Sequence, residues 1–236
     1  DEGLWPYMES AMAEWGVQAV SIPHASAFTG HNWKVRDDVL RPVAEVYSAW
    51  GSSMDESLLG NVAIGLRHGQ RLGFIGASDN HDGFIGNDMQ GKNVLGGLGA
   101  IMATELSASA LLNGLSNRRT YATTGDRMLL RVNVLDEGIV YQPGQEWKRS
   151  LEVDEPAVLS AEINGTNGIA LVQLYQTRVN ARGTSEIVAE WDLKGACDDC
   201  SVSTDLVFSP ASTEVFWLRV EQLDGEVAWS SPFWVA

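Results

Sequence analysis

The sequence has few of the residues that most often carry metal or redox chemistry: its 236 residues include two cysteines and four histidines. It also has no apolar run near the roughly 18 to 20 residues of a membrane-spanning helix, so we expect no such span. No signal-peptide pattern is visible, and the chain starts on Asp1 in a helical pattern, which predicts a mature or excised piece of a longer protein. With nine tryptophans and 44% apolar residues, it can still bury a sizeable core.

Several common functional motifs are missing as well. There is no G-x-S-x-G, no Walker loop and no G-x-G-x-x-G after a strand, which argues against a serine-hydrolase elbow, a nucleotide-binding loop and a dinucleotide site. The formal net charge of −15 repels phosphate backbones, so we expect no nucleic-acid partner.

Cys197 and Cys200 form a lone C-x-x-C in "ACDDC". This spacing occurs in half zinc sites, redox pairs and short-loop disulfides. No second Cys or His pair lies nearby to complete a zinc site, and the two acidic residues between the cysteines disfavour the thiolate that redox work needs. We favour a structural disulfide, with two inert thiols as the alternative. A disulfide predicts export to a periplasmic or extracellular compartment, and a cytoplasmic location is the alternative.

The first half alternates helical and strand patterns. Helical spacing predicts one helix over 4–15 and another over 105–119, and Ser53 to Glu56 has capping-box spacing for a helix between them. Apolar segments over 17–24, 43–48 and 71–78 predict buried strands. Alternation of this kind is typical of parallel βα units.

From Asp126 onward the apolar residues recur with a period of two. Five alternating segments, separated by turn signals such as "NGTNG" and "LDGE", predict antiparallel strands. This pattern is typical of an immunoglobulin-like β-sandwich. We therefore expect a boundary near Gly125, with an α/β region over 1–125 and an all-β sandwich over 126–236.

Four residues in the first half are candidates for a site. His24, Glu45, Asp79 and His81 lie in or just after the expected strands, and the ends of parallel strands converge in an α/β barrel. Imidazole and carboxylate together suit Zn, Mn or Fe better than Ca. The alternatives are structural: a hydrogen-bonded turn at "SDNHD", a buried salt bridge at Glu45 and a strand cap at His24. His31 stays undecided, and His68 reads as a surface residue.

The segments "SIPHA", "AEVYSAWGSS", "LGFIGASDNHDG", "RRTYATTGDRM" and "AWSSPFWV" occur in this order. Together they resemble the domain-of-unknown-function family numbered 3604 over nearly the whole chain. The resemblance implies a PHP-type (polymerase and histidinol phosphatase) metal-dependent phosphoesterase, with a distorted (β/α) barrel, up to three divalent ions and a β-sandwich tail.

By this resemblance, His24 matches the "PH" motif, Asp79 and His81 match the closing Asp-x-His motif, and Glu45 matches an acidic strand position. His24, Asp79 and His81 would be metal ligands, and Glu45 would be the catalytic candidate that orients a ligand or the attacking water. Two features depart from the family: Ala25 stands where a second His is usual, and the opening His-x-His motif is absent. The chain would then be the C-terminal part of a barrel whose N-terminal half is missing.

We therefore expect the C-terminal portion of a PHP-like hydrolase that acts on a small-molecule phosphoester by metal-activated water. The chain by itself would have weak or no activity. The alternative is a non-catalytic binding module, in which a degenerate barrel supports a sandwich for partner binding. The tryptophan count also suggests a carbohydrate-associated module, which would need aromatic residues in a row on one sandwich face.

Overall fold

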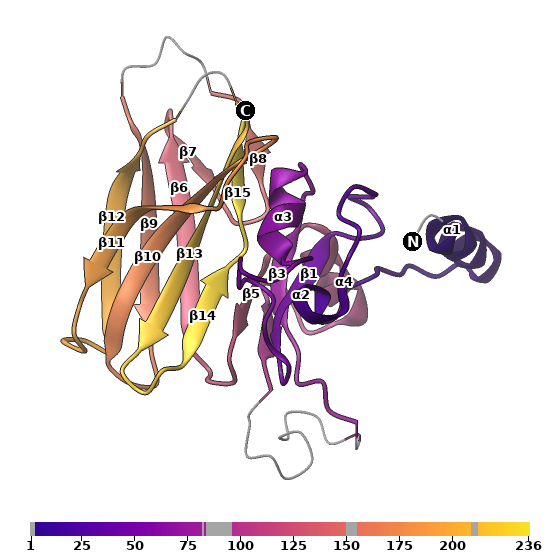
Figure 1. Ribbon diagram of the computed structural model, residues 1–236, viewed down its shortest axis with the longest axis horizontal. Helices are drawn as coiled ribbons and strands as arrows, with labels where there is room; N and C mark the ends of the chain where they lie inside the picture. The colour runs from indigo at the N-terminus through magenta and orange to yellow at the C-terminus, as the bar shows by residue number, and fades with distance from the viewer. Residues whose placement is uncertain (1–2, 82, 84–95, 150–154, 209–211) are drawn as a thin grey trace.

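The computed structural model describes residues 3–81, 83, 96–149, 155–208 and 212–236. Figure 1 shows two stacked β-layers on one side and a smaller layer of helices and short strands on the other, with α1 standing apart near the N-terminus. In the described residues, no helix is long and apolar enough to cross a membrane.

The smaller layer is built around one parallel strand pair. Its helices and strands are α2 (Ser26–Thr29), β1 (Val43–Ser48), β2 (Gly51–Ser52), α3 (Val62–Arg67) and β3 (Gly73–Gly76), and α1 (Leu4–Trp15) precedes them in the chain. β1 pairs with β3 in parallel and with β2 antiparallel, and α3 makes the crossover between β1 and β3. The helix expected over 4–15 is observed and ends at Gly16, which adopts the left-handed conformation that favours glycine.

The other two layers are larger sheets. The eight-stranded sheet contains β4 (Leu98–Ile101), β5 (Thr120–Thr123), β8 (Glu146–Trp147), β10 (Ile169–Arg178), β11 (Glu186–Asp192), β13 (Glu214–Gln222), β14 (Val227–Ser230) and β15 (Phe233–Val235). The four-stranded sheet contains β6 (Leu129–Asp136), β7 (Ile139–Tyr141), β9 (Ala157–Asn164) and β12 (Asp199–Leu206). The remaining helix, α4 (Ala108–Ser116), lies between β4 and β5 in the chain and has Ser107 as its N-cap.

Two apolar clusters hold the layers together. One lies between the two large sheets and takes alternate residues of their strands, such as Val132, Leu159, Leu174 and Leu218. The other fastens the small sheet and α3 to the opposite face of the eight-stranded sheet, through residues that include Phe74 and Trp217. The eight-stranded sheet is therefore covered on both faces.

The fold class expected from the sequence is wrong. No closed barrel forms in the described residues, where the only parallel strand pairs are β1–β3 and β8–β15. Residues 17–24 form no regular strand, and Val17 and Ile22 are exposed. β4 and β5 lie before the expected boundary at Gly125, yet β5 pairs with β14 in the large sheet.

Glycines let the small sheet approach the large one closely. A Cβ on Gly76 would lie 2.6 Å from the carbonyl oxygen of Leu98, and one on Gly97 would lie 2.7 Å from that of Tyr47. Glycine inside a strand often marks such a close backbone approach. The glycines of "GFIGAS" and "VLGGLG" are therefore the means by which β3 packs directly against β4.

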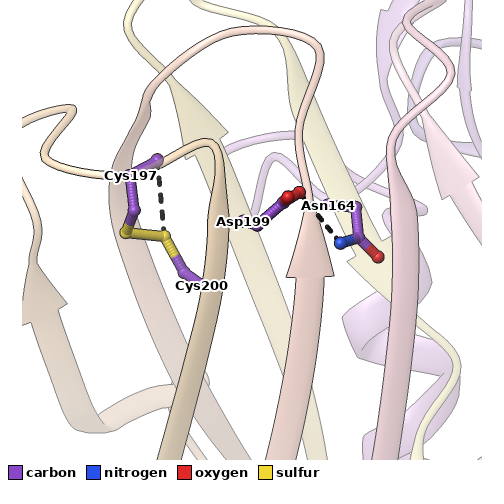
Figure 2. The surroundings of a disulfide bond; sticks show 4 residues. All are labelled: Asn164, Cys197, Asp199 and Cys200. Carbon is purple, nitrogen blue, oxygen red and sulfur yellow. Dashed lines mark hydrogen bonds between the residues drawn. A yellow bond between two sulfur atoms is a disulfide. The ribbon is translucent and has the colours of Figure 1, made fainter.

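Cys197 and Cys200 are joined by a disulfide in the turn that leads into β12 (Figure 2). The backbone N–H of Ile169 donates to the carbonyl of Cys197 at 2.8 Å, and the Asn164 amide donates to Asp199 Oδ1 at 2.9 Å. The disulfide thus fixes a loop at one end of the two large sheets, and the expected pairing of the two cysteines is confirmed.

Candidate functional site

Residues 21–24 run beside β1 without forming a regular strand. The Ser21 N–H donates to the carbonyl of Leu40 at 2.6 Å, and the Glu45 N–H donates to the carbonyl of Pro23 at 3.2 Å. These two bonds place His24 next to the side chain of Glu45, although the two residues are far apart in sequence.

Glu45 is buried, and its carboxylate contacts two partners, the His24 ring and the Ala25 backbone. Its carboxylate lies 2.9 and 3.0 Å from Nδ1 of His24, and its Oε1 also accepts from the backbone N–H of Ala25 at 3.0 Å. A carboxylate can only accept, so Nδ1 of His24 carries a proton and Nε2 points away from Glu45. Carboxylates commonly orient metal-binding histidines in this way.

Asp79 lies between the two histidines. Its Oδ1 is 3.4 Å from Nε2 of His24 and 3.3 Å from Nε2 of His81. Its Oδ2 is buried and has no hydrogen-bond partner among the residues that the structure describes. Asp79 also has a φ of 54°, a left-handed conformation that costs energy unless the surroundings impose it.

We call His24, Glu45, Asp79 and His81 the histidine cluster. A His24 ring whose proton is on Nδ1 presents a lone pair from Nε2 to a carboxylate oxygen, and two lone pairs repel. The arrangement is favourable when a cation or a second proton lies between them. The cluster therefore has an electrostatic requirement for positive charge at Asp79.

The four side chains of the cluster differ in exposure: the two carboxylates are largely buried and the two imidazoles are exposed. The side chains of Glu45 and Asp79 are 6% and 9% exposed, whereas those of His24 and His81 are 47% and 70% exposed. Both imidazole rings are thus partly open to solvent, while the carboxylates are partly desolvated, which strengthens their attraction for a cation.

The donor set fits a divalent transition metal. Two ligand atoms that each lie about 2.1 Å from a tetrahedral ion are about 3.4 Å apart, close to the two nitrogen-to-Oδ1 distances observed. In the described part of the chain, however, no three His, Cys, Asp or Glu side chains already surround a single point. Binding of an ion would therefore require side chains of the cluster to move.

The backbone of the Asp79 loop is held by the small layer and by β4. The Ala77 N–H donates to the carbonyl of Tyr47 at 3.0 Å. A Cβ on Gly96 would lie 2.2 Å from Cα of Ser78, so the chain before β4 packs directly on this loop. The sequence shows "VLGGLG" as glycine-rich, but its part in supporting Asp79 is visible only in the structure.

The other histidines lie outside the cluster. His31 packs against Trp33, with ring centroids 4.3 Å apart, and its Nε2 lies 2.6 Å from a guanidinium nitrogen of Arg41. Burial, and then the charge of Arg41, lowers the pKa of His31 to about 4. His68 is exposed at the C-terminus of α3, as expected. Asp82 and Asp88, which the sequence suggests as loop acceptors, lie outside the described residues.

The capping box expected at Ser53 to Glu56 does not form. α3 begins later, where Asn61 accepts from the Ile64 N–H at 3.1 Å. Glu56 instead accepts from Arg67 at 2.7 Å and from the Ser185 N–H at 2.9 Å. It therefore links the small layer to the loop between β10 and β11.

No family model matches the chain. It is 25% identical over 242 residues to an uncharacterized protein of Chlamydia trachomatis serovar D, and 26% identical over 242 residues to an uncharacterized protein of Chlamydia pneumoniae. Each match covers 92% of this chain and 38% of the relative, so the chain spans about two fifths of the length of these relatives. Among solved structures, pectate lyase Pel3 from Pectobacterium carotovorum aligns over 39% of this chain and 26% of its own, with 22% identity and a TM-score of 0.28.

Proposed function

We propose that the histidine cluster binds one divalent metal ion, with His24, Asp79 and His81 as ligands, and that the chain contributes this site to a metal-dependent hydrolase of phosphoesters. The observation that supports the ion is the position of Asp79 Oδ1, which lies within 3.4 Å of two imidazole Nε2 atoms. The phosphoester class rests on the sequence resemblance, and the proposal needs no barrel.

Each residue has a distinct part in this proposal. His24 is turned toward the ion by Glu45, which makes Glu45 a positioning residue rather than a ligand. Asp79 supplies the negative charge, and its second oxygen, buried and without a partner among the described residues, is available to the ion or to a coordinated water. His81 closes the site from its exposed loop.

The ion proposed is Zn, Mn or Fe, because two imidazoles and one carboxylate suit these metals. When bound, such an ion activates a water molecule and neutralises charge on a phosphoryl group. Three protein ligands leave coordination positions for water and substrate, as in catalytic rather than structural sites.

The test is the metal content of the purified chain after incubation with Zn²⁺ and desalting, measured by elemental mass spectrometry. We expect near-stoichiometric metal in the wild type and its loss in a double variant, Asp79→Ala with His81→Ala. His68→Ala is the matched control, because it removes an exposed histidine outside the cluster. Equal metal in the wild type and the double variant, or none in either, would overturn the ion site.

Hydrolysis is tested separately with bis-p-nitrophenyl phosphate and Mn²⁺ or Zn²⁺. We expect slow metal-dependent release of p-nitrophenol that disappears in the double variant. If metal binds stoichiometrically and no phosphoester is cleaved, the ion site stands and the hydrolase falls. The non-catalytic binding module would then be the better description of this chain.

A further inference from the structure

A cavity of about 680 Å³ opens where the small layer meets the eight-stranded sheet, and no residue of the histidine cluster is among its lining residues in the described part of the chain. Its walls come from β1 and β2 on one side and from β10, β13 and β14 on the other. The volume lies within the roughly 300 to 1,000 Å³ of small-molecule sites. We call it the aromatic cavity, after its principal lining residues, which are Tyr47, Tyr175, Trp217 and Trp229.

The aromatic rings are arranged as two stacked pairs. Tyr47 stacks on Trp229 with centroids 5.9 Å apart, and Tyr175 stacks on Trp217 at 5.4 Å and 11°. Both tryptophans are buried, whereas both tyrosines are half-buried. Because one face of each tyrosine is covered by a tryptophan, the exposed part of each ring is its other face or its edge, and the tryptophans hold the rings in place.

The register of the paired strands explains why these aromatic residues lie side by side on one face of the sheet. Tyr175 lies directly opposite Trp217 in the β10–β13 pairing, and Trp229 lies opposite Arg219 in the β13–β14 pairing. Residues two apart on a strand share a face, so Trp217 and Arg219 point the same way. The face of the sheet that looks away from the four-stranded sheet therefore carries aromatic residues side by side.

The polar groups of the cavity are mostly acceptors and hydroxyls. Glu56 is held by Arg67 and Ser185, Glu226 accepts from the hydroxyl of Thr124, and Ser52 and Thr184 lie nearby. Among the described residues that line the cavity, Arg219 is the only cation, and it is already paired with Glu221 at 2.7 Å. Carboxylates near a ligand repel phosphate and other anions.

The tyrosine hydroxyls are held in their donor form. Burial, and then the charge of Glu226, raises the pKa of Tyr47. Burial also raises the pKa of Tyr175, with Glu56, Glu190 and Glu221 acting in the same direction against Arg219. Each phenol thus stays protonated at ordinary pH, and the hydroxyl of Tyr175 already donates to Gln173 Oε1 at 3.2 Å.

We propose that the aromatic cavity binds a neutral oligosaccharide. Sugar rings present C–H groups on one face, which pack on the electron-rich faces of aromatic rings, and hydroxyls at their edges, which pair with fixed carboxylates and hydroxyls. Two aromatic platforms on different strands suit a ligand of more than one ring. A quaternary ammonium group needs rings gathered around a single point, and this cavity is larger than such a group requires.

The test begins with the wild-type chain on a printed array of neutral and sialylated glycans, followed by titration of the best neutral glycan by tryptophan fluorescence. We expect saturable binding of a neutral glycan, weakened about tenfold or more in Tyr47→Ala and in Tyr175→Ala. Tyr7→Ala is the matched control, because it removes a tyrosine that is 67% exposed on α1. Near-ultraviolet circular dichroism checks that each variant is folded.

If an alanine variant does not fold, Glu226→Gln replaces it, since this change keeps the shape and removes the charge that accepts sugar hydroxyls. Failure to bind any neutral glycan, binding of sialylated glycans alone, or unchanged affinity in all the cavity variants would each overturn the proposal. The outcome is independent of the histidine cluster, because none of the cluster residues lines this cavity.

Discussion

Glu45 and Tyr47 lie two positions apart on β1, yet they belong to different regions. A regular strand would place both side chains on the same face. The register between β1 and β3 shifts between these two residues, and such irregularities re-aim side chains. Glu45 therefore holds His24 in the histidine cluster, whereas Tyr47 stacks on Trp229 in the aromatic cavity.

The two regions also differ in how they are built. The histidine cluster depends on loops, and both Ala25 and Asp79 have positive φ angles there. The aromatic cavity depends mainly on paired strands whose side chains are fixed by stacking. We infer that an ion would complete the order of the cluster, while the cavity is already formed before its ligand binds.

The largest change in the free energy of unfolding is expected for Gly96→Ala. This substitution should disrupt the histidine cluster and leave the aromatic cavity intact. The new Cβ would clash with Cα of Ser78, so the Asp79 loop must move. Overpacking of this kind costs about 1 to 3 kcal/mol, and we expect the upper end because the obstacle is backbone. Urea denaturation measures the loss, and the metal content should fall with it.

Gly3→Ala is the control, because among the described residues no atom beyond its chain neighbours lies within 4 Å of the position that its Cβ would take. It should change the free energy of unfolding by less than about 0.5 kcal/mol. If Gly96→Ala is as stable as the wild type and keeps its metal, the packing of this glycine on Ser78 does not support the cluster.

Glu45→Gln is expected to lower the metal affinity of the histidine cluster and to leave glycan binding in the aromatic cavity unchanged. The amide keeps an oxygen for the Ala25 N–H but offers His24 no negative charge, so the ring is held less firmly. Loss of such a partner lowers metal affinity by about 10- to 100-fold. Competition with a fluorescent chelator measures this, and glycan binding in the cavity should not change. Glu9→Gln, on the exposed side of α1, is the control, and equal affinities in the two variants would contradict the positioning role.

The sequence located much of the candidate site. His24, Glu45, Asp79 and His81 are close together in the structure, because the residues before His24 run beside β1 and because β1 and β3 are parallel neighbours. One βαβ unit is enough for this convergence. The metal role of these residues remains a prediction.

The fold of the first half was not predictable in the same way. An apolar segment does not say which sheet it will join: residues 17–24 join none, while β4 and β5 extend the large sheet. Strands whose apolar residues recur with a period of two were easier to predict, because the alternation itself indicates one buried face, as in β6 and β9. The aromatic cavity was missed, because strand register, which sequence periodicity does not give, decides that Tyr175 faces Trp217.

A change far from both regions should leave each of them intact. The disulfide closes a loop of sequence separation 3, for which loss of chain entropy gives a stabilisation of about 2 kcal/mol. Cys197→Ser with Cys200→Ser should therefore lower the melting temperature by about 4 to 8 °C. Metal and glycan affinities should stay the same, and the reduced wild type is the matched control. A variant that loses either binding activity would show that the sandwich end is coupled to that region.

The smallest expected effect is the contribution of His31 to the pH dependence of the free energy of unfolding. In the unfolded chain His31 takes up a proton near its ordinary pKa of 6.5, whereas in the folded chain burial and Arg41 hold its pKa at about 4. Between these two values the unfolded state binds more protons, so the free energy of unfolding falls as the pH falls from 6.5 to 4, and this contribution levels off below pH 4. Half-exposure of the ring weakens the effect.

In urea denaturation, the free energy of unfolding of His31→Gln should fall less steeply over this pH range than that of the wild type, while His68→Gln, exposed on α3, should follow the wild type. Parallel curves for His31→Gln and the wild type would mean that His31 is as easily protonated in the folded chain as in the unfolded one.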